Sequence, residues 1–490
     1  MNESYSRRIA DNTAAFVAGQ SFSRLFDILT ILFLARYLGV DDFGKFSFAF
    51  AYVGVFAVVT DLGVNLILVR ETAKSAEAGS LLYGSGITLK LLLACVGWLA
   101  AAGSILLLHN PPEIKVLVTI VSLNLLVSFR MPSFKDTFEV PLIARLKLKY
   151  SAGAAAANRV ITFLAIIAAI LLKAPLWLLT LVYTIISIPS FLLLLRFSRA
   201  VVRPTLRAKK SEWAYLLKEG LPLGLAGIFA IIYAQFDTLL LSRFWTMKEI
   251  SLYSAARRVT EPLQLIPAAL GLSILPIMSQ FFARSKDEII KIYRKSLLYM
   301  LLLAIPLSFL LMSFSRPIIA VLFGKEFRNA EQSLVILSCY LPFIFISNMA
   351  TAVFIAIHKQ KTNSLIWAAA LALYFVLNLI LIPRYAYVGA SIVRLATGMF
   401  IAILSLLWAA RYLGRMDLRF LVRIGLLTVP LVAASRLVLA SRPVLAFLFF
   451  IVLFSGGLFA LKILGPEDIL FLKRSVLRFF ARRHRDKAQD

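Results

Sequence analysis

The stretch LIWAAALALYFVLNLILI, residues 365–382, contains no charged side chain and a single amide, Asn378. A helix needs roughly 20 mostly apolar residues to cross the hydrocarbon core of a bilayer, so this stretch has the length of one crossing. Other apolar runs recur along the chain, at 116–129, 161–172, 221–234 and 444–460. Strands of membrane barrels alternate apolar and polar residues, and these runs do not, so they predict transmembrane helices.

The composition agrees with this interpretation. Hydrophobic residues make up 60% of the 490 residues, charged residues 16%, and the mean hydropathy is +0.86. A soluble domain carries about 25% charged residues, so this chain lacks the polar surface that water on all sides requires. We predict an all-α integral membrane protein with about fourteen transmembrane helices, over residues 12–35, 46–69, 81–108, 116–129, 151–172, 176–195, 221–242, 250–282, 296–315, 332–357, 364–382, 387–410, 424–440 and 444–464. The fourth span is short, and we expect it to extend into the following segment.

The distribution of charge predicts how the chain is oriented. The net charge is +28, and most lysines and arginines fall in the two termini and in every second connection. Positive charge concentrates in cytoplasmic loops, so we predict a multi-pass protein of the plasma (inner) membrane with both termini in the cytoplasm. These basic residues sit in short loops between apolar helices. They therefore favour contact with membrane lipids and argue against nucleic acid as a partner.

Several classes of site have no signature in the sequence. Cys95 and Cys339 fall inside predicted spans, the three histidines are dispersed, and no metal-ligand spacing occurs. The chain also lacks a Gly-x-x-x-x-Gly-Lys-Ser/Thr loop, which argues against direct use of ATP. We therefore expect no metal site and no cofactor.

The two halves of the chain resemble each other, which favours a repeat with parallel orientation, as in many transporters. The matching stretches are LFDIL 25–29 with QFDTL 235–239, GKFS 44–47 with SLYS 251–254, and DLGV 61–64 with ALGL 269–272. Chance similarity between two apolar segments is the alternative. The domains we predict are an N-terminal lobe at 1–219, a C-terminal lobe at 220–423, a helix pair at 424–464 and a basic cytoplasmic tail at 465–490.

Five motifs in a fixed order resemble those of a known family. They are LARYLG at 34–39, DLG at 61–63, EGLPL at 219–223, LFGKEF at 322–327 and LNLILIPRY at 377–385. The chain is similar to the polysaccharide transporters, which are flippases for lipid-linked oligosaccharides such as O-antigen precursors. They belong to the multidrug/oligosaccharidyl-lipid/polysaccharide exporter superfamily. The resemblance implies two pseudo-symmetric six-helix lobes around a central cavity, followed by two C-terminal helices.

Charged residues inside predicted spans are the candidates for a site. A charge in the middle of a membrane is costly and usually faces a cavity or a partner. The candidate substrate-binding residues of a cationic cavity are Arg24, Lys90, Arg159, Arg257, Arg258 and Arg394. The candidates for ion coupling or ion pairing are Asp27, Asp61, Asp237 and Glu261. Guanidinium groups bind phosphate through paired hydrogen bonds, so such a cavity suits a diphosphate-linked lipid.

A purely structural interpretation is also open. Arg24 with Asp27, and Arg257 or Arg258 with Glu261, have the spacing of ion pairs within one helix. Lys90 and Arg159 could extend to the inner membrane surface, and Asp237 could pair across helices.

Pro262 and Pro267 interrupt the eighth predicted span. Prolines remove backbone donors and bend helices, so these two are the candidate hinge of a transport cycle.

We therefore predict a flippase that moves polyprenyl-diphosphate-linked oligosaccharide from the cytoplasmic to the outer face by alternating access. The expected partners are this lipid-linked substrate, membrane lipids and, as candidates, proteins of polysaccharide assembly. A multidrug-type exporter of the same superfamily is one alternative, although a cationic cavity disfavours its cationic substrates. A membrane polysaccharide polymerase or glycosyltransferase is a less favoured one, because the predicted outer loops are short.

Overall fold

The structure is a computed structural model that describes residues 3–74, 76–282, 285–414, 419–439, 442–461 and 463. Within these ranges every regular element is an α-helix or a short 3-10 helix, so the predicted all-α class is confirmed. The basic tail predicted at 465–490 lies outside the described residues.

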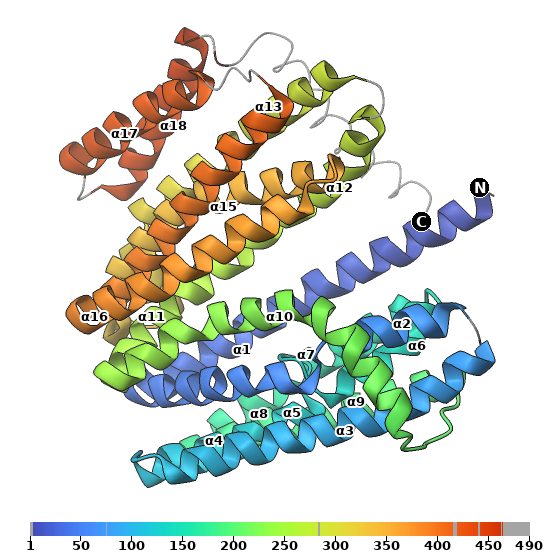
Figure 1. Ribbon diagram of the computed structural model, residues 1–490. Coiled ribbons are helices and arrows are strands. Elements are labelled where there is room, and N and C mark those ends of the chain that lie inside the picture. Colours follow the sequence, from blue (N-terminus) through green and yellow to red (C-terminus); the bar gives the residue numbers. More distant parts are fainter. Residues whose placement is uncertain are drawn as a thin grey trace, which may run out of the picture. The chain divides into compact units, whose positions relative to one another are not determined.

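The contacts of the chain divide it into two compact units. Unit 1 comprises Met1–Pro262, Ile319–Ser333 and Ala370–Thr397, and unit 2 comprises Leu263–Ile318, Leu334–Ala369 and Gly398–Asp490. The elements up to the first unit boundary are α1 (Glu3–Phe56), η1 (Ala57–Thr60), α2 (Val64–Lys74), α3 (Ala76–Leu107), α4 (Pro112–Ser122), α5 (Asn124–Val127), η2 (Phe134–Glu139), α6 (Val140–Ala144), α7 (Leu148–Leu171), α8 (Leu176–Ile185), α9 (Ser187–Val201), α10 (Lys210–Phe244) and α11 (Met247–Thr260) (Figure 1). The rest are η3 (Glu261–Gln264), α12 (Leu265–Phe282), α13 (Lys286–Ser313), α14 (Ser315–Leu322), η4 (Lys325–Phe327), α15 (Ala330–Ala356), α16 (Gln360–Leu413), α17 (Arg419–Leu439) and α18 (Pro443–Ala460).

Two of these helices are each a pair of helices joined at one residue. α1 and α16 both span 54 residues. At 1.5 Å per residue each would be about 80 Å long, far more than the roughly 30 Å of a hydrocarbon core. The helical geometry is interrupted at Gly39 (φ 71°) in α1 and at Ala386 (φ 49°) in α16. Glycine tolerates positive φ, so Gly39 supplies the turn without steric cost, whereas Ala386 adopts it as an uncommon exception.

Nine segments among the described residues are long and apolar enough to cross a membrane. The longest include Met247–Phe282, with 36 residues, and Gln360–Leu413, with 54. The chain is therefore a multi-pass membrane protein, as predicted.

The fourth predicted span differs from the expectation. Helix α5 ends at Val127, residues 128–133 are not helical, and η2 and α6 continue the chain to Ala144. The sequence predicted a short span that extends beyond residue 129 into the following segment, but it did not predict this break. Ser128 and Ser133, at the two ends of this break, are buried inside the protein.

Each unit has its own packing. In unit 1, α1 packs against α7, α10 and α11. Residues after η1 approach α10 so closely that a Cβ added to Gly224 would lie 2.6 Å from the backbone nitrogen of Gly63. In unit 2, α13 packs against α12, α17 and α18, with the rings of Phe309 and Phe450 stacked at 4.0 Å. The small residues of unit 1 allow backbones to meet where large side chains would hold them apart.

Candidate functional site

Unit 1 encloses a cavity of about 340 Å³. Its charged lining consists of five arginines against two carboxylates, so its walls are cationic. These residues are Arg24, Asp27, Arg130, Arg159, Arg257, Arg258 and Glu261. They come from α1, from the break after α5, and from α7, α11 and the start of η3. The cavity therefore brings together charges that lie up to 237 positions apart in the chain.

Asp27 is the acidic centre of one wall. Arg159 donates from Nη1 to Asp27 Oδ1 at 2.6 Å and from Nη2 to the carbonyl of Phe129 at 2.8 Å. Arg159 therefore ties α7 both to α1 and to the backbone where the fourth span breaks. A bond between two charged groups is among the stronger hydrogen bonds of a protein interior, so this arginine is largely occupied.

Arg130 lies beside this pair, within the break after α5. Its Nε is 3.7 Å from Asp27 Oδ1, and its guanidinium carbon lies 4.1 Å from the centroid of the Tyr183 ring. The side chain is 10% exposed. None of its three nitrogens has a hydrogen-bond acceptor in the part of the chain that the structure describes. Arg130 thus lines the cavity with buried nitrogens that lack acceptors among the described residues, while the Tyr183 ring lies against its guanidinium.

The opposite group of lining charges belongs to α11 and η3. Arg257 donates from Nε to Glu261 Oε1 at 2.8 Å and from Nη1 to the carbonyl of Ala234 at 3.1 Å. The expected i,i+4 pair between Arg257 and Glu261 is therefore present. Arg24 and Arg258 are exposed residues that line the cavity, and neither side chain makes a hydrogen bond to another described residue.

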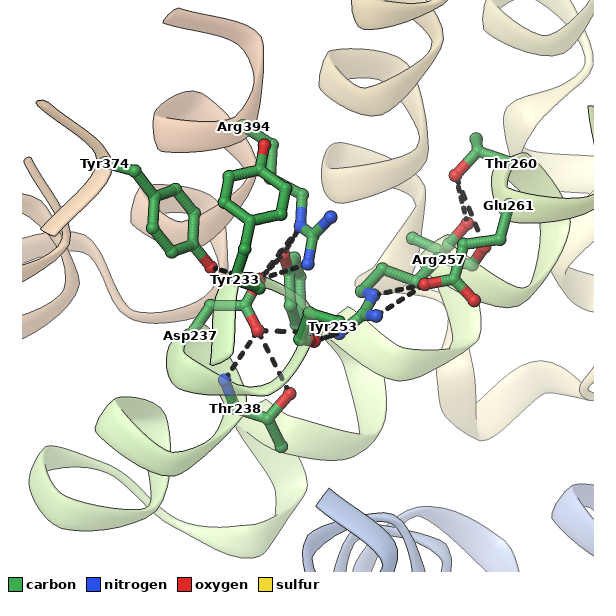
Figure 2. A network of polar contacts seen from close by, with 11 residues as sticks. Tyr233, Asp237, Thr238, Tyr253, Arg257, Thr260, Glu261, Tyr374 and Arg394 are labelled. Carbon is green, nitrogen blue, oxygen red and sulfur yellow. Dashed lines mark hydrogen bonds and ion pairs between the residues drawn. The ribbon is translucent and has the colours of Figure 1, made fainter. Parts of the chain in front are cut away.

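Asp237 is the centre of a second network, which is sealed (Figure 2). Its Oδ2 accepts from the Tyr253 hydroxyl at 2.5 Å and from Arg394 Nε at 2.8 Å, while Oδ1 accepts from the Thr238 backbone N–H at 2.7 Å. Arg257 Nη1 approaches Oδ1 at 3.4 Å and so links this network to the cavity wall. The Asp237 side chain is fully buried, so it pairs across helices rather than facing the cavity.

Aromatic rings complete the enclosure of Asp237. Figure 2 shows Tyr233, Tyr253 and Tyr374 gathered around it. The guanidinium of Arg394 lies 5.4 Å from the centroid of the Tyr233 ring, and Tyr374 donates to the carbonyl of Tyr233 at 3.0 Å. Rings thus surround the charges, and the Tyr253 hydroxyl is hydrogen-bonded to both Asp237 and Arg394.

Lys90 and Asp61 form a third pair, away from the cavity. Lys90 Nζ lies 3.0 Å from Asp61 Oδ1, and the lysine side chain is completely buried. Asp61 also accepts from the backbone N–H of Asn65 at 3.1 Å. A buried lysine needs such an acceptor, so this pair holds α3 against the turn between η1 and α2.

The sequence thus identified part of the cavity. Six of its ten charged candidates line it, namely Arg24, Asp27, Arg159, Arg257, Arg258 and Glu261. The other four, Lys90, Asp61, Asp237 and Arg394, are not in its lining. Arg130 does line it but was placed by the sequence in a connection. The shortness of the apolar run 116–129 predicted that the span extends further, and Pro132, two residues after Arg130, is the signal that could have revealed its break.

The candidate hinge lies at a structural junction. Pro262 is in the 3-10 turn η3, between α11 and α12, and Pro267 is in the first turn of α12. The chain first passes from one compact unit to the other between Pro262 and Leu263. No group of three or more His, Cys, Asp or Glu side chains suited to a metal ion occurs within the described ranges.

Outside the spans, Glu71 of α2 belongs to an exposed cluster with Arg70 and Lys74. Partial burial alone would raise the pKa of Glu71. Hydrogen bonds from Lys74 and Arg70 outweigh that effect and hold the pKa below its ordinary value.

The sequence model of the family described as "Polysaccharide biosynthesis protein" matches residues 9–282, more than half of the chain. The chain belongs to this family. A second model, MatE, matches residues 222–381. Both are families of the multidrug/oligosaccharidyl-lipid/polysaccharide exporter superfamily, whose members are transporters and flippases rather than enzymes.

One relative aligns with this chain over nearly its whole length. The "probable low-salt glycan biosynthesis flippase Agl15" of Haloferax volcanii is 22% identical over 459 residues, which are 90% of this chain and 92% of the relative. Among solved structures, the lipid II flippase MurJ in an inward closed conformation has a TM-score of 0.71 at 17% identity, covering 92% of this chain and 99% of that one. An inward-facing multidrug MATE transporter has a TM-score of 0.61 at 14% identity, covering 80% and 94%. The chain therefore shares the fold of these transporters.

Proposed function

We propose that this family member is a flippase for polyprenyl-diphosphate-linked oligosaccharide, used in the assembly of a surface polysaccharide or glycan. The observation that carries the proposal is the cationic cavity of unit 1, with five arginines against two carboxylates. A diphosphate linkage is anionic, and arginine binds phosphate oxygens in a matching geometry. The glycan flippase name of the Haloferax volcanii relative supports the same substrate class.

The proposed topology is fourteen crossings in two six-helix lobes, divided at 219/220, with a final helix pair at 424–464. The breaks at Gly39 and Ala386 support it, because each of the two longest helices then supplies two crossings. The segments α11 to α12, α8 to α9 and the broken fourth span each serve as one crossing. We propose that both termini are cytoplasmic, in the plasma membrane.

The proposed cycle is alternating access. The lipid tail stays in the bilayer while the anionic headgroup and its sugars pass through the cavity. The 3-10 turn at Pro262 lies where the chain first passes from one compact unit to the other, which supports a hinge there. An ion gradient or the membrane potential drives the cycle, since the sequence holds no nucleotide-binding loop.

A multidrug exporter is the second candidate, because the MatE model matches residues 222–381. Such exporters of cationic compounds need acidic or aromatic walls. The excess of arginine in the cavity disfavours a cation, so the glycan-lipid proposal takes precedence.

The test uses the native host. Deletion is expected to leave lipid-linked oligosaccharide on the inner face of the plasma membrane, and the wild-type gene restores its passage. Arg24→Glu and Arg258→Glu should each abolish this rescue without loss of protein, because they place a carboxylate where the diphosphate binds. Arg328→Glu, an exposed arginine outside the cavity lining, is the matched control and should rescue fully. Full rescue by both cavity variants contradicts the proposal.

A further inference from the structure

The five arginines of the cavity are not equivalent. Arg159 is occupied by Asp27 and the Phe129 carbonyl, and Arg257 by Glu261 and the Ala234 carbonyl. All three nitrogens of Arg257 have acceptors, and so do both terminal nitrogens of Arg159, whose Nε lacks one among the described residues. A guanidinium whose terminal donors already have protein acceptors has little left to offer a ligand. These two arginines fix the walls, so ligand binding falls to the others.

Arg130 is distinguished from all of them by burial without acceptors. Its side chain is only 10% exposed, yet its Nε, Nη1 and Nη2 have no hydrogen-bond acceptor within the described ranges. Arginine stays protonated in proteins, so this site cannot relieve the cost of burial by losing its proton. An unsatisfied buried donor is costly, and a charged one more so, unless an anion satisfies it.

The surroundings of Arg130 hold it ready for such an anion. The Tyr183 ring, 4.1 Å from its guanidinium carbon, supports the charge without consuming a single N–H. Asp27 lies at 3.7 Å, beyond hydrogen-bond distance but close enough to balance the charge. Arg159 donates a hydrogen bond to the carbonyl of Phe129, the residue next to Arg130, and so holds the backbone from which the Arg130 side chain extends.

The backbone at Arg130 adds an independent reason. Residues 128–133 leave helical geometry between α5 and η2. Broken membrane helices recur where transporters bind charged ligands, because the break lets side chains and backbone reach a cavity. Helical hydrogen bonds are lost in the same segment that brings Arg130 into the cavity lining.

We propose that Arg130 binds a phosphate group of the transported headgroup and that Asp27 is the internal anion with which this phosphate competes. This inference rests on the proposed function for the identity of the substrate. The chemistry it requires is a diphosphate, which either a polyprenyl lipid or a soluble anion can carry.

The experiment measures binding to the purified full-length protein in nanodiscs by isothermal titration calorimetry. The two probes are inorganic diphosphate and farnesyl diphosphate, which separate a soluble anion from a lipid headgroup. Arg130→Gln should weaken binding of whichever probe the wild type binds by about tenfold or more, the loss expected for a hydrogen-bonded charge. Arg145→Gln, the same change at an exposed arginine of the same connection, should leave affinity unchanged.

Two further variants separate binding from folding. Arg130→Lys keeps the charge but loses the fork of donors, so its affinity should lie between those of the wild type and Arg130→Gln. Asp27→Asn removes the competing anion and should tighten binding about fivefold or more. That gain should vanish in the double variant Asp27→Asn/Arg130→Gln. A merely structural role for the pair would change stability in all of these and affinity in none.

The outcomes also distinguish this inference from the proposed function. Wild-type affinity for diphosphate in Arg130→Gln overturns the inference, even if the wild type transports lipid-linked oligosaccharide. Loss of diphosphate binding in Arg130→Gln supports the inference, even if no glycan lipid crosses the membrane. A wild-type protein that binds neither probe overturns the inference, while deletion and rescue in the native host decide the proposed function.

Discussion

Asp27 and Asp237 occupy matching places in the two similar halves of the chain, in LFDIL 25–29 and QFDTL 235–239. Each carboxylate is bound by an arginine from a distant helix, Arg159 for the first and Arg394 for the second. Yet Asp27 is 21% exposed in the wall of the cavity, whereas Asp237 is completely buried. The same pair of groups thus forms an accessible site in one half and a sealed cross-link in the other.

The surroundings explain the difference. Asp237 is enclosed by Tyr233, Tyr253 and Tyr374, and the Tyr253 hydroxyl both donates to it and accepts from Arg394 at 2.6 Å. Asp27 lies beside the break in the fourth span, where the cavity reaches it. A carboxylate–arginine pair is therefore not a signature of transport by itself. The role of such a pair depends on its surroundings: aromatic rings enclose the pair at Asp237, whereas the break in the fourth span leaves the pair at Asp27 open to the cavity.

The largest effect that separates the two sites is expected from neutralising each carboxylate. Asp237→Asn leaves Arg394 buried without its counter-ion, so the free energy of unfolding should fall by about 3–5 kcal/mol. Asp27→Asn should cost about 1 kcal/mol, because Arg159 keeps the Phe129 carbonyl. Titration with sodium dodecyl sulfate in mixed micelles measures both. Equal losses would remove the distinction between a sealed and an open site.

A smaller contrast concerns one hydroxyl group at each site. Tyr253→Phe removes a donor to Asp237 and an acceptor for Arg394, so unfolding should become easier by about 1–3 kcal/mol. Tyr183→Phe keeps the ring that supports Arg130 and should change stability by less than about 0.5 kcal/mol. The same micelle titration compares the two. A larger loss at Tyr183 would mean that its hydroxyl, and not its ring, maintains the open site.

The sealed site can also be tested by replacing it with apolar residues. The combined variant Asp237→Leu/Tyr253→Phe/Arg394→Met removes the carboxylate, the hydroxyl and the guanidinium that bind one another, while Arg257 keeps its pair with Glu261. Buried ion pairs can often be replaced this way without loss, so stability should return to within about 1 kcal/mol of the wild type. Flipping activity is the second measurement. If Asp237 only cross-links helices, the variant transports, whereas a stable but inactive variant assigns Asp237 to coupling.

The exposed cluster around Glu71 supplies a baseline with the smallest expected effect. The pKa of Glu71 is held below the ordinary 4.5. The contribution of the Glu71 ion pairs to folding stability is therefore present above pH 4.5 and is lost as the pH falls through the lowered pKa. Exposed ion pairs are weak, so the difference in unfolding free energy between wild type and Glu71→Gln should be below about 1 kcal/mol at pH 7. That difference should shrink further by pH 3.5. A difference that grows on acidification contradicts the pairing.

The sequence predicted local features well. The long apolar runs are helices, and the i,i+4 pair of Arg257 with Glu261 forms as its spacing indicates. Apolar length and helical spacing are properties of one segment, so a single sequence contains them. Arg24 and Asp27 have similar spacing, yet Asp27 pairs with Arg159 instead.

The remaining features depend on tertiary packing. Nothing near Asp237 in the sequence predicts Arg394, 157 positions away, because their contact is created when α10 meets α16. Arg130 was missed for a related reason. It follows the end of an apolar run, which normally means a loop, and only the packing of Tyr183 and Asp27 around it shows that the chain is still inside the protein.

The broken fourth span also bears on how the protein is made. Its two helical pieces, α4 and α5, together run only from Pro112 to Val127, and an arginine follows within three residues. A segment this short with a charge at its end partitions poorly into lipid on its own when the translocon releases it. We therefore expect its insertion to wait for α7, whose Arg159 holds the Phe129 carbonyl. The feature that opens a binding site would then make membrane integration of this region a cooperative event.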